Sequence, residues 1–309
     1  MLKRIRYLLP LTILLFLAEQ AGSQYNPLTE NKKYTIPFRL TKFNNIVIKV
    51  VLNEKDTADL MFHTAAGDIT LTEEAAARLK TIHFDGTVDS VQSWGGNANQ
   101  SGYSRNNSVS INQFQKDAVT IWKDLNSGYE TDGKFGPSLF GDKVVEIDFD
   151  KKLLIVESSL PRKARKYEKL SIVPGDDAIF IKAVCKTKDR SFENTFMLHS
   201  GYSGAVLLDD SFAARTSIGK LIPITGEKKL SDAYGNIITT KKGLLPFFQL
   251  GTQTISSVPI GFFEGALGRQ TISVIGGDII RRFNWVIDRK KGYVYIKKNK
   301  LLTSPFSNL

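Results

Sequence analysis

The chain has 309 residues, of which 42% are hydrophobic and 24% are charged. This composition is typical of a globular protein with room for two domains, and it argues against a disordered or low-complexity chain. The formal net charge of +11 is scattered, with one local basic cluster at residues 162–169, so we expect no nucleic-acid-binding module.

Residues 1–23 have the pattern of a secretory signal peptide. A basic start is followed by an apolar run over residues 7–18 and by small residues at 21–23. This run is short for a membrane span, so we expect no stable span and predict a secreted or periplasmic protein after cleavage. An uncleaved N-terminal anchor is the alternative interpretation.

Short β-rich runs bounded by turn-forming residues dominate the remaining chain, and helical patterns are few. Helices are expected only at residues 72–80 and 209–216. Cys185, the single cysteine, excludes an intrachain disulfide and is expected to pack in the core of a strand at 179–185. The other expected strands are 46–52, 109–111, 144–149, 153–156 and 294–296. This pattern predicts an all-β protein of sandwich or barrel type.

An internal repeat sharpens this prediction. Residues 60–65 (LMFHTA) and 196–201 (FMLHSG) each lead through a hydrophobic run to a histidine, a hydroxyl residue and a small residue. The two histidines are 136 positions apart in a chain that holds only three. Repeats this long indicate two homologous lobes, which we place at 33–160 and 173–299, with a linker at 161–172 and a tail at 300–309.

Further landmarks give the repeat a family resemblance. Glycine-containing segments follow each histidine turn at 132–136 (DGKFG) and 273–278 (SVIGGD), and residues 281–288 close the second copy. Together these segments resemble aspartic proteases of the retropepsin and pepsin type, in their tandem, secreted, bacterial-style form. The resemblance covers about residues 33–299 and implies an all-β fold of two homologous barrel lobes with a central cleft and few short helices.

The chain departs from this family at the catalytic positions, because His63 and His199 stand where the resemblance places the two catalytic aspartates. The family's hydroxyl residues brace the two turns, and here both hydroxyls are kept, while alanine replaces the first turn glycine. The residues expected to support the dyad are Thr64, Ser200, Ala65 and Gly201.

This replacement changes the expected chemistry. An aspartic protease needs two carboxyls that share one proton, whereas two imidazoles in the same cleft carry a net charge of 0 or +1. We therefore expect a non-catalytic pseudoprotease that binds an extended peptide or protein segment, without a cofactor. A monomer is expected because both halves of the cleft lie in one chain. The resemblance places covering hairpins at Trp94, Gly95 and Gly96 and at Tyr234, although Trp94 could equally cap an apolar patch.

Two alternatives remain open from the sequence. The first is an active peptidase that uses a histidine-based or unrecognised dyad; Asp68, the first acid after His63, is matched by Gly204 in the second copy. The second is a two-histidine metal site. The remaining histidine, His83, lies in a polar, loop-like stretch, so no third ligand is evident and we assign no metal.

Overall fold

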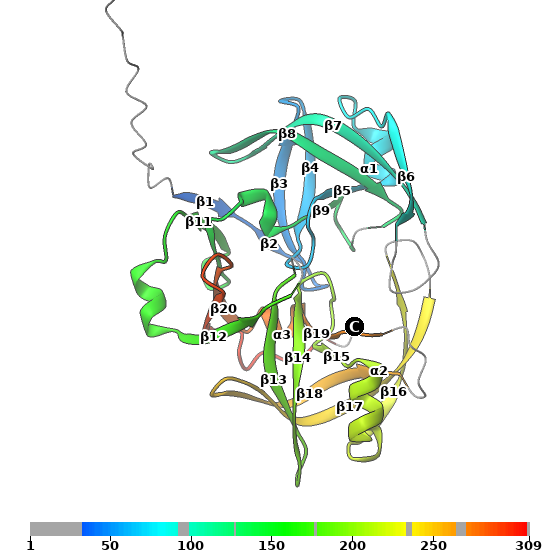
Figure 1. Cartoon of the computed structure of the whole chain (residues 1–309), viewed down its shortest axis with the longest axis vertical. Coiled ribbons are helices and arrows are strands. Elements are labelled where there is room, and N and C mark those ends of the chain that lie inside the picture. Colours follow the sequence, from blue (N-terminus) through cyan, green and yellow to red (C-terminus); the bar gives the residue numbers. More distant parts are fainter. Residues whose placement is uncertain are drawn as a thin grey trace, which may run out of the picture. The chain divides into compact units, whose positions relative to one another are not determined.

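The computed structural model describes residues 33–91, 99–126, 128–175, 178–232, 237–263 and 270–307. Residues 31–309 form one compact unit that consists mainly of β-strands (Figure 1). In the part of the chain that is described, no helix is long and apolar enough to cross a membrane. The helical elements in that part are short: α1 (Glu73–Arg78), α2 (Asp210–Thr216), α3 (Gly277–Ile280), η1 (Pro137–Phe140), η2 (Arg162–Lys166) and η3 (Ile218–Lys220).

The N-terminal lobe is a closed barrel. Its strands run in the order β3-β4-β9-β5-β8-β7, and β7 pairs again with β3 to complete the ring. Two further strands, β2 and β6, lie at the ends of this sheet. The bounds are β2 (Arg39–Leu40), β3 (Ile46–Leu52), β4 (Asp56–Phe62), β5 (Ile69–Thr72), β6 (Gly86–Val91), β7 (Asn99–Ile111), β8 (Phe114–Asp124) and β9 (Gly133–Phe135).

The C-terminal lobe repeats this topology strand for strand. The order is β13-β14-β19-β15-β18-β17, with β17 pairing back onto β13 and β16 lying at the edge. The bounds are β13 (Phe180–Lys186), β14 (Ser191–His199), β15 (Val206–Leu207), β16 (Ile224–Ser231), β17 (Ile237–Leu250), β18 (Gln253–Phe262) and β19 (Ser273–Gly276). The predicted fold class, two homologous barrel lobes with few short helices, is therefore confirmed.

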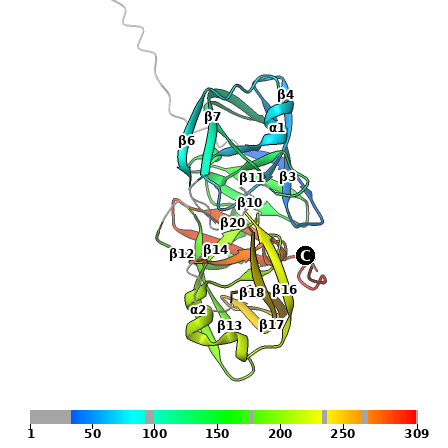
Figure 2. The same ribbon diagram turned by 90° about the vertical axis from the view of Figure 1, so that its right-hand side faces the viewer.

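A third set of strands joins the two lobes. β10 from the first half of the chain pairs with β20 from the second, which gives the continuous order β1-β11-β10-β20-β21-β12 (Figures 1 and 2). The bounds are β1 (Tyr34–Pro37), β10 (Val144–Asp148), β11 (Leu153–Glu157), β12 (Glu168–Val173), β20 (Phe283–Asp288) and β21 (Tyr293–Lys298). The segment 161–172, expected as a linker, contains η2 and most of β12, which pairs with both β21 and β13.

Local sequence signals account for the elements nearest the cleft. β3 is rich in the β-branched residues Ile and Val, which favour strands, and covers the predicted range 46–52. Both predicted helices form, and each is capped by a side-chain oxygen: Thr72 accepts from the Ala75 amide and Asp209 from the Phe212 amide. Cys185 is fully buried in β13, as its apolar surroundings predict.

Candidate functional site

The two histidines stand at equivalent strand ends. His63 follows β4, and His199 is the last residue of β14. Each strand lies parallel to a second strand of its own barrel, with Phe62 opposite Phe135 and His199 opposite Gly276. In both lobes the chain then turns back, because the amide three residues further on donates to the histidine carbonyl at 3.0 Å.

Glycine is required where the second strand passes each turn. A side chain at Gly136 would overlap the carbonyl of Ala66, and one at Gly276 would overlap the carbonyl of Gly204. The glycines that mark the repeat in the sequence therefore permit close backbone approach to the histidine turns.

Reciprocal hydrogen bonds from two buried hydroxyls join the turns. The hydroxyl of Thr64 donates to the Leu198 carbonyl at 2.7 Å and accepts from the Ser200 amide at 3.0 Å. The hydroxyl of Ser200 donates to the Phe62 carbonyl at 2.8 Å and accepts from the Thr64 amide at 3.0 Å. These four bonds, which we call the hydroxyl brace, fix the position of each lobe's turn against the other.

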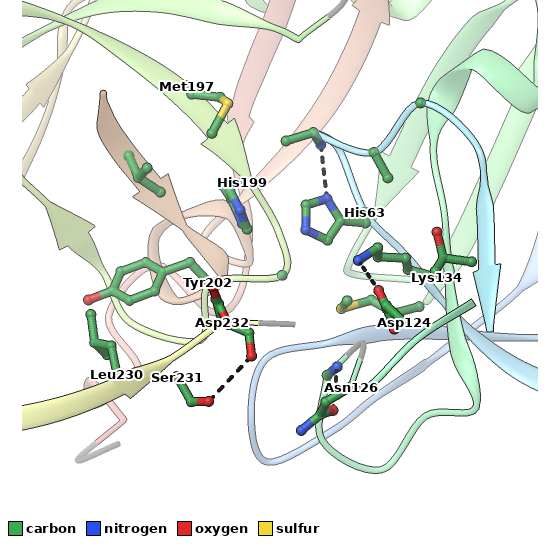
Figure 3. Close-up of a pocket in the computed structure, with 18 of the residues that line it drawn as sticks. His63, Asp124, Asn126, Lys134, Met197, His199, Tyr202, Leu230, Ser231 and Asp232 are labelled. Carbon is green, nitrogen blue, oxygen red and sulfur yellow. Dashed lines mark hydrogen bonds and ion pairs between the residues drawn. The ribbon is translucent and has the colours of Figure 1, made fainter. Parts of the chain in front are cut away.

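The brace brings the two imidazoles into contact (Figure 3). Their ring centroids are 4.4 Å apart, with 64° between the ring planes. The Ala65 amide donates to Nδ1 of His63 at 3.1 Å, so Nδ1 carries a lone pair and the proton of the neutral ring lies on Nε2. Nδ1 of His199 is buried, and no residue of the described chain forms a hydrogen bond with it.

The small residue that follows each hydroxyl makes the site asymmetric. The Cδ2–Nε2 edge of His63 lies against Gly201, where a Cβ would overlap the ring. The equivalent position in the first turn is Ala65, which carries a Cβ. The two turns therefore offer different space to the opposing ring.

Both imidazoles are held neutral by their surroundings. Burial, the neighbouring His199 ring and the charge of Lys134 hold the pKa of His63 well below 6.5. Burial, together with the Lys134 charge, lowers the pKa of His199 to about 4. Lys134 itself forms an ion pair with Asp124, with Nζ and Oδ2 2.8 Å apart. Neither histidine is therefore charged at neutral pH.

The histidine pair lies in a cleft of about 740 Å³ that both lobes line. Side chains from the C-terminal lobe give it an apolar wall, whereas the N-terminal lobe contributes Asp68, Asp124 and Lys134. The Asp68 carboxylate accepts from Nε1 of Trp122 at 3.1 Å. The apolar wall consists of Met197, Tyr202, Leu207, Leu230, Ile272 and Val274.

The predicted cover of the cleft lies mostly outside the described residues. Trp94, Gly95, Gly96 and Tyr234 all belong to stretches that are not described. Of the strands that flank these stretches, β6 contributes Val88, β7 contributes Ser101, and β16 contributes Leu230 and Ser231 to the cleft lining. His83 is exposed and lies outside the cleft lining, as its polar context predicts.

Sequence reasoning missed the charged pair beside the histidines. Lys134 lies within the glycine-containing segment 132–136, so the sequence places it near the histidine turn. No sequence pattern indicates that its side chain lines the cleft. Asp124 ends β8, and no local pattern predicts that this residue meets Lys134. Among the described residues, no three His, Cys, Asp or Glu side chains gather in a group that could hold a metal ion.

Comparison with known proteins supports the fold. No family model matches the chain, and no curated protein matches it in sequence. Among solved structures, it is similar to an aspartic proteinase from Irpex lacteus, with a TM-score of 0.59 and 11% identity. The match covers 88% of this chain and 99% of the proteinase. At this identity the likeness concerns the fold, so the chain has the two-lobed, all-β fold of a pepsin-like aspartic proteinase.

Proposed function

We propose that the protein is a non-catalytic member of the aspartic-protease fold that binds an extended peptide or protein segment in its cleft. In this proposal His63 and His199 stand where the proteases carry their two aspartates. The observation that carries the proposal is the imidazole pair itself, 4.4 Å between centroids, at the hydroxyl-braced junction of the two lobes.

The chemistry of the pair argues against peptide hydrolysis. A carboxyl dyad holds one proton between two oxygens, so one group can deprotonate water while the other donates to the scissile carbonyl. The His63 ring directs its only free lone pair toward the Ala65 amide and packs its Nε2 edge against Gly201. Neither nitrogen of His63 is therefore placed to take a proton from a water in the cleft.

The cleft nevertheless has the features of a binding groove. It has about 740 Å³ of space, and large hydrophobic side chains at its rim are exposed, including Val88 at 39% and Ile272 at 37%. β6 and β16 each end their sheet, so each offers an unpaired edge among the described strands. An extended segment could add to such an edge through main-chain hydrogen bonds while apolar side chains enter the groove.

We also propose that the protein acts outside the cytoplasm. The support is the signal-like pattern of residues 1–23. N-terminal sequencing of protein recovered from the cell envelope or medium tests this: a start at or near Gln24 is expected, and an uncleaved chain would contradict it.

The binding proposal is tested with a mixed peptide library at pH 4 and pH 7. Peptides that the protein retains and peptides that it cleaves are identified separately by mass spectrometry, with and without a pepstatin-like inhibitor. We expect retention without cleavage. Ile272→Lys, which places a charge at the apolar rim, should reduce retention, whereas Lys188→Ala on the β13–β14 turn should not.

The same assay distinguishes a peptidase. Cleavage that disappears in His63→Ala and persists in the matched control His83→Ala would overturn the non-catalytic assignment. Retention that is equal in the wild-type protein and in Ile272→Lys would show that the segment binds elsewhere.

A further inference from the structure

The two halves of the cleft differ in polarity, although the lobes that form them are homologous. Lys134 of β9 and Val274 of β19 hold equivalent registers, each beside the methionine that precedes a cleft histidine by two positions. On the next strand, Thr70 of β5 pairs with Lys134, whereas Leu207 of β15 pairs with Val274. All four residues line the cleft, so at these matched positions its N-terminal half is polar and its C-terminal half is aliphatic.

The described residues that line the cleft carry a negative formal charge, although the whole chain carries +11. Three carboxylates and one ammonium group give the lining a formal charge of −2: Asp68, Asp124, Asp232 and Lys134. The stretches 92–98 and 233–236, where covering hairpins are expected, contain no charged residue. Charges further apart than about 8 Å are largely screened at physiological ionic strength, and a cleft lined by one sign of charge focuses its field. A ligand in the cleft therefore responds to the lining more than to the net charge of the protein.

Asp68 is the carboxylate that is best placed to meet a ligand. It is exposed, and its Oδ2 accepts from Nε1 of Trp122, which also lines the cleft, at 3.1 Å. A carboxylate has about four acceptor positions, so this bond leaves room for a guanidinium or ammonium group. The adjacent indole supplies an aromatic face, which attracts a cation. Asp124, in contrast, is buried and pairs with Lys134 at 2.8 Å, so that pair adds no net charge.

Tyr129 offers a second aromatic surface in the same cleft. Its side chain is 56% exposed, and its ring stacks on Phe43 with centroids 4.5 Å apart and 26° between the ring planes. This contact holds the ring in place without covering it. Because aromatic faces attract cations and also pack against apolar side chains, the cleft suits a segment that carries both.

We propose that the segment bound in the cleft is cationic, with an arginine side chain on Asp68 and Trp122 and an apolar side chain on the wall of the C-terminal lobe. Figure 3 shows two residues of this wall, Tyr202 and Leu230, on the side of the histidine pair that lies away from Lys134. Arginine is favoured over lysine because its planar guanidinium donates to a carboxylate and stacks on an aromatic ring at the same time. The inference rests on the proposed peptide-binding function and specifies the class of its ligand.

The test uses three peptide libraries that differ at one fixed position. This position holds arginine, its uncharged analogue citrulline, or glutamate, and the flanking positions are randomised among Ala, Val, Leu, Phe and Ser. Peptides retained by the full-length protein are quantified by mass spectrometry. We expect arginine peptides to be retained at least about tenfold better than citrulline peptides, and glutamate peptides to be retained least. The advantage of arginine should shrink as the salt concentration rises from about 0.05 M to about 0.5 M.

Matched variants identify the carboxylate responsible. Asp68→Asn keeps the side-chain size and removes the charge, so the preference for arginine over citrulline should largely disappear. Retention of citrulline peptides by this variant should stay at the wild-type level, which shows that its cleft is intact. Asp117→Asn makes the same change at an exposed residue of β8 outside the cleft lining, and should keep the wild-type preference.

The outcomes separate this inference from the function on which it rests. Equal retention of arginine and citrulline peptides by the wild type, or a preference for glutamate, would overturn the cationic ligand. A preference for arginine that persists in Asp68→Asn, or that Asp117→Asn also abolishes, would overturn the role of Asp68. In each of these cases, citrulline peptides whose retention falls in Ile272→Lys would leave peptide binding in the cleft standing. Retention of no peptide at all would overturn the proposed function and this inference together.

Discussion

The hydroxyl brace gives the sharpest test of how the two lobes are held together. Thr64 is 3% exposed and Ser200 is 1% exposed, and each hydroxyl donates one hydrogen bond and accepts another across the lobe junction. Thr64→Val keeps the side-chain shape but leaves the Ser200 amide and the Leu198 carbonyl without partners. Each buried group left unpaired costs about 1–3 kcal/mol, so for the two groups we expect a loss of about 2–6 kcal/mol in the free energy of unfolding.

The size of this effect is read from denaturant unfolding curves of Thr64→Val and of the variants with which it is compared. Thr64→Ser keeps the hydroxyl and should lose less than about 1 kcal/mol. Thr87→Val removes a hydroxyl from an exposed residue of β6 and should be within about 0.5 kcal/mol of wild type. The double variant Thr64→Val/Ser200→Ala should lose less than the sum of the single losses, because once one side is broken the turns can separate and hydrate.

Two results would refute this reasoning. If Thr64→Val were as stable as Thr87→Val, the hydrogen bonds of Thr64 would not hold the lobes together. If Thr64→Ser were as damaging as Thr64→Val, the loss would come from packing and the hydroxyl would not be responsible.

Three further predictions concern the rings and the chain end. Gly201→Ala places a Cβ on the His63 ring and should destabilise the protein by about 1–3 kcal/mol, a loss that His63→Ala should partly rescue if the overlap is its cause. The pKa of His199 falls from 6.5 to about 4, so between these values only the unfolded chain takes up a proton. Stability should therefore decrease as the pH falls through this window, with about 3 kcal/mol due to His199 and a further loss due to His63, whose pKa is also lowered; a His199→Gln variant with the same pH profile as the wild type would contradict this. Deleting residues 300–309 removes the carbonyls of three residues to which the buried Arg282 donates, and should cost about 3 kcal/mol or more; an unchanged Tm would show that the tail does not hold this guanidinium.

The repeat made the barrels predictable from the sequence. A strand, a histidine turn, a capped helix and a glycine-containing strand recur in the same order in each half, and each of them is a local signal that spans only a few residues. Because two homologous halves fold alike, the position of one turn relative to its barrel predicts the position of the other. The strand order in the two barrels follows the same plan for this reason.

Contacts between distant segments could not be predicted in the same way. Pairing of β10 with β20 joins residues about 140 positions apart, and neither strand has a sequence pattern that indicates which strand it pairs with. The ion pair of Lys134 with Asp124 joins the middle of β9 to the end of β8, two strands that are not adjacent in the barrel. The sequence shows that Ala65 differs from Gly201, but its effect on the opposing ring requires the relative placement of both turns.

The charge state and the tautomer of the two histidines could be predicted only in part from the sequence. Two facing imidazoles suggest a net charge of 0 or +1. The structure favours the neutral state at neutral pH, because both rings are buried and lie near the Lys134 charge. The tautomer of His63 depends on the Ala65 amide, a contact within its own turn that residue types alone do not indicate.

The contact between the two imidazoles can be measured directly by NMR. The chain has three histidines, so its ring-proton spectrum is simple to assign with His63→Gln, His83→Gln and His199→Gln variants. Ring centroids 4.4 Å apart predict nuclear Overhauser cross-peaks between the rings of His63 and His199 and none from either ring to His83. Well-resolved ring signals of His63 and His199 without a cross-peak between them would place the two turns apart and contradict the account.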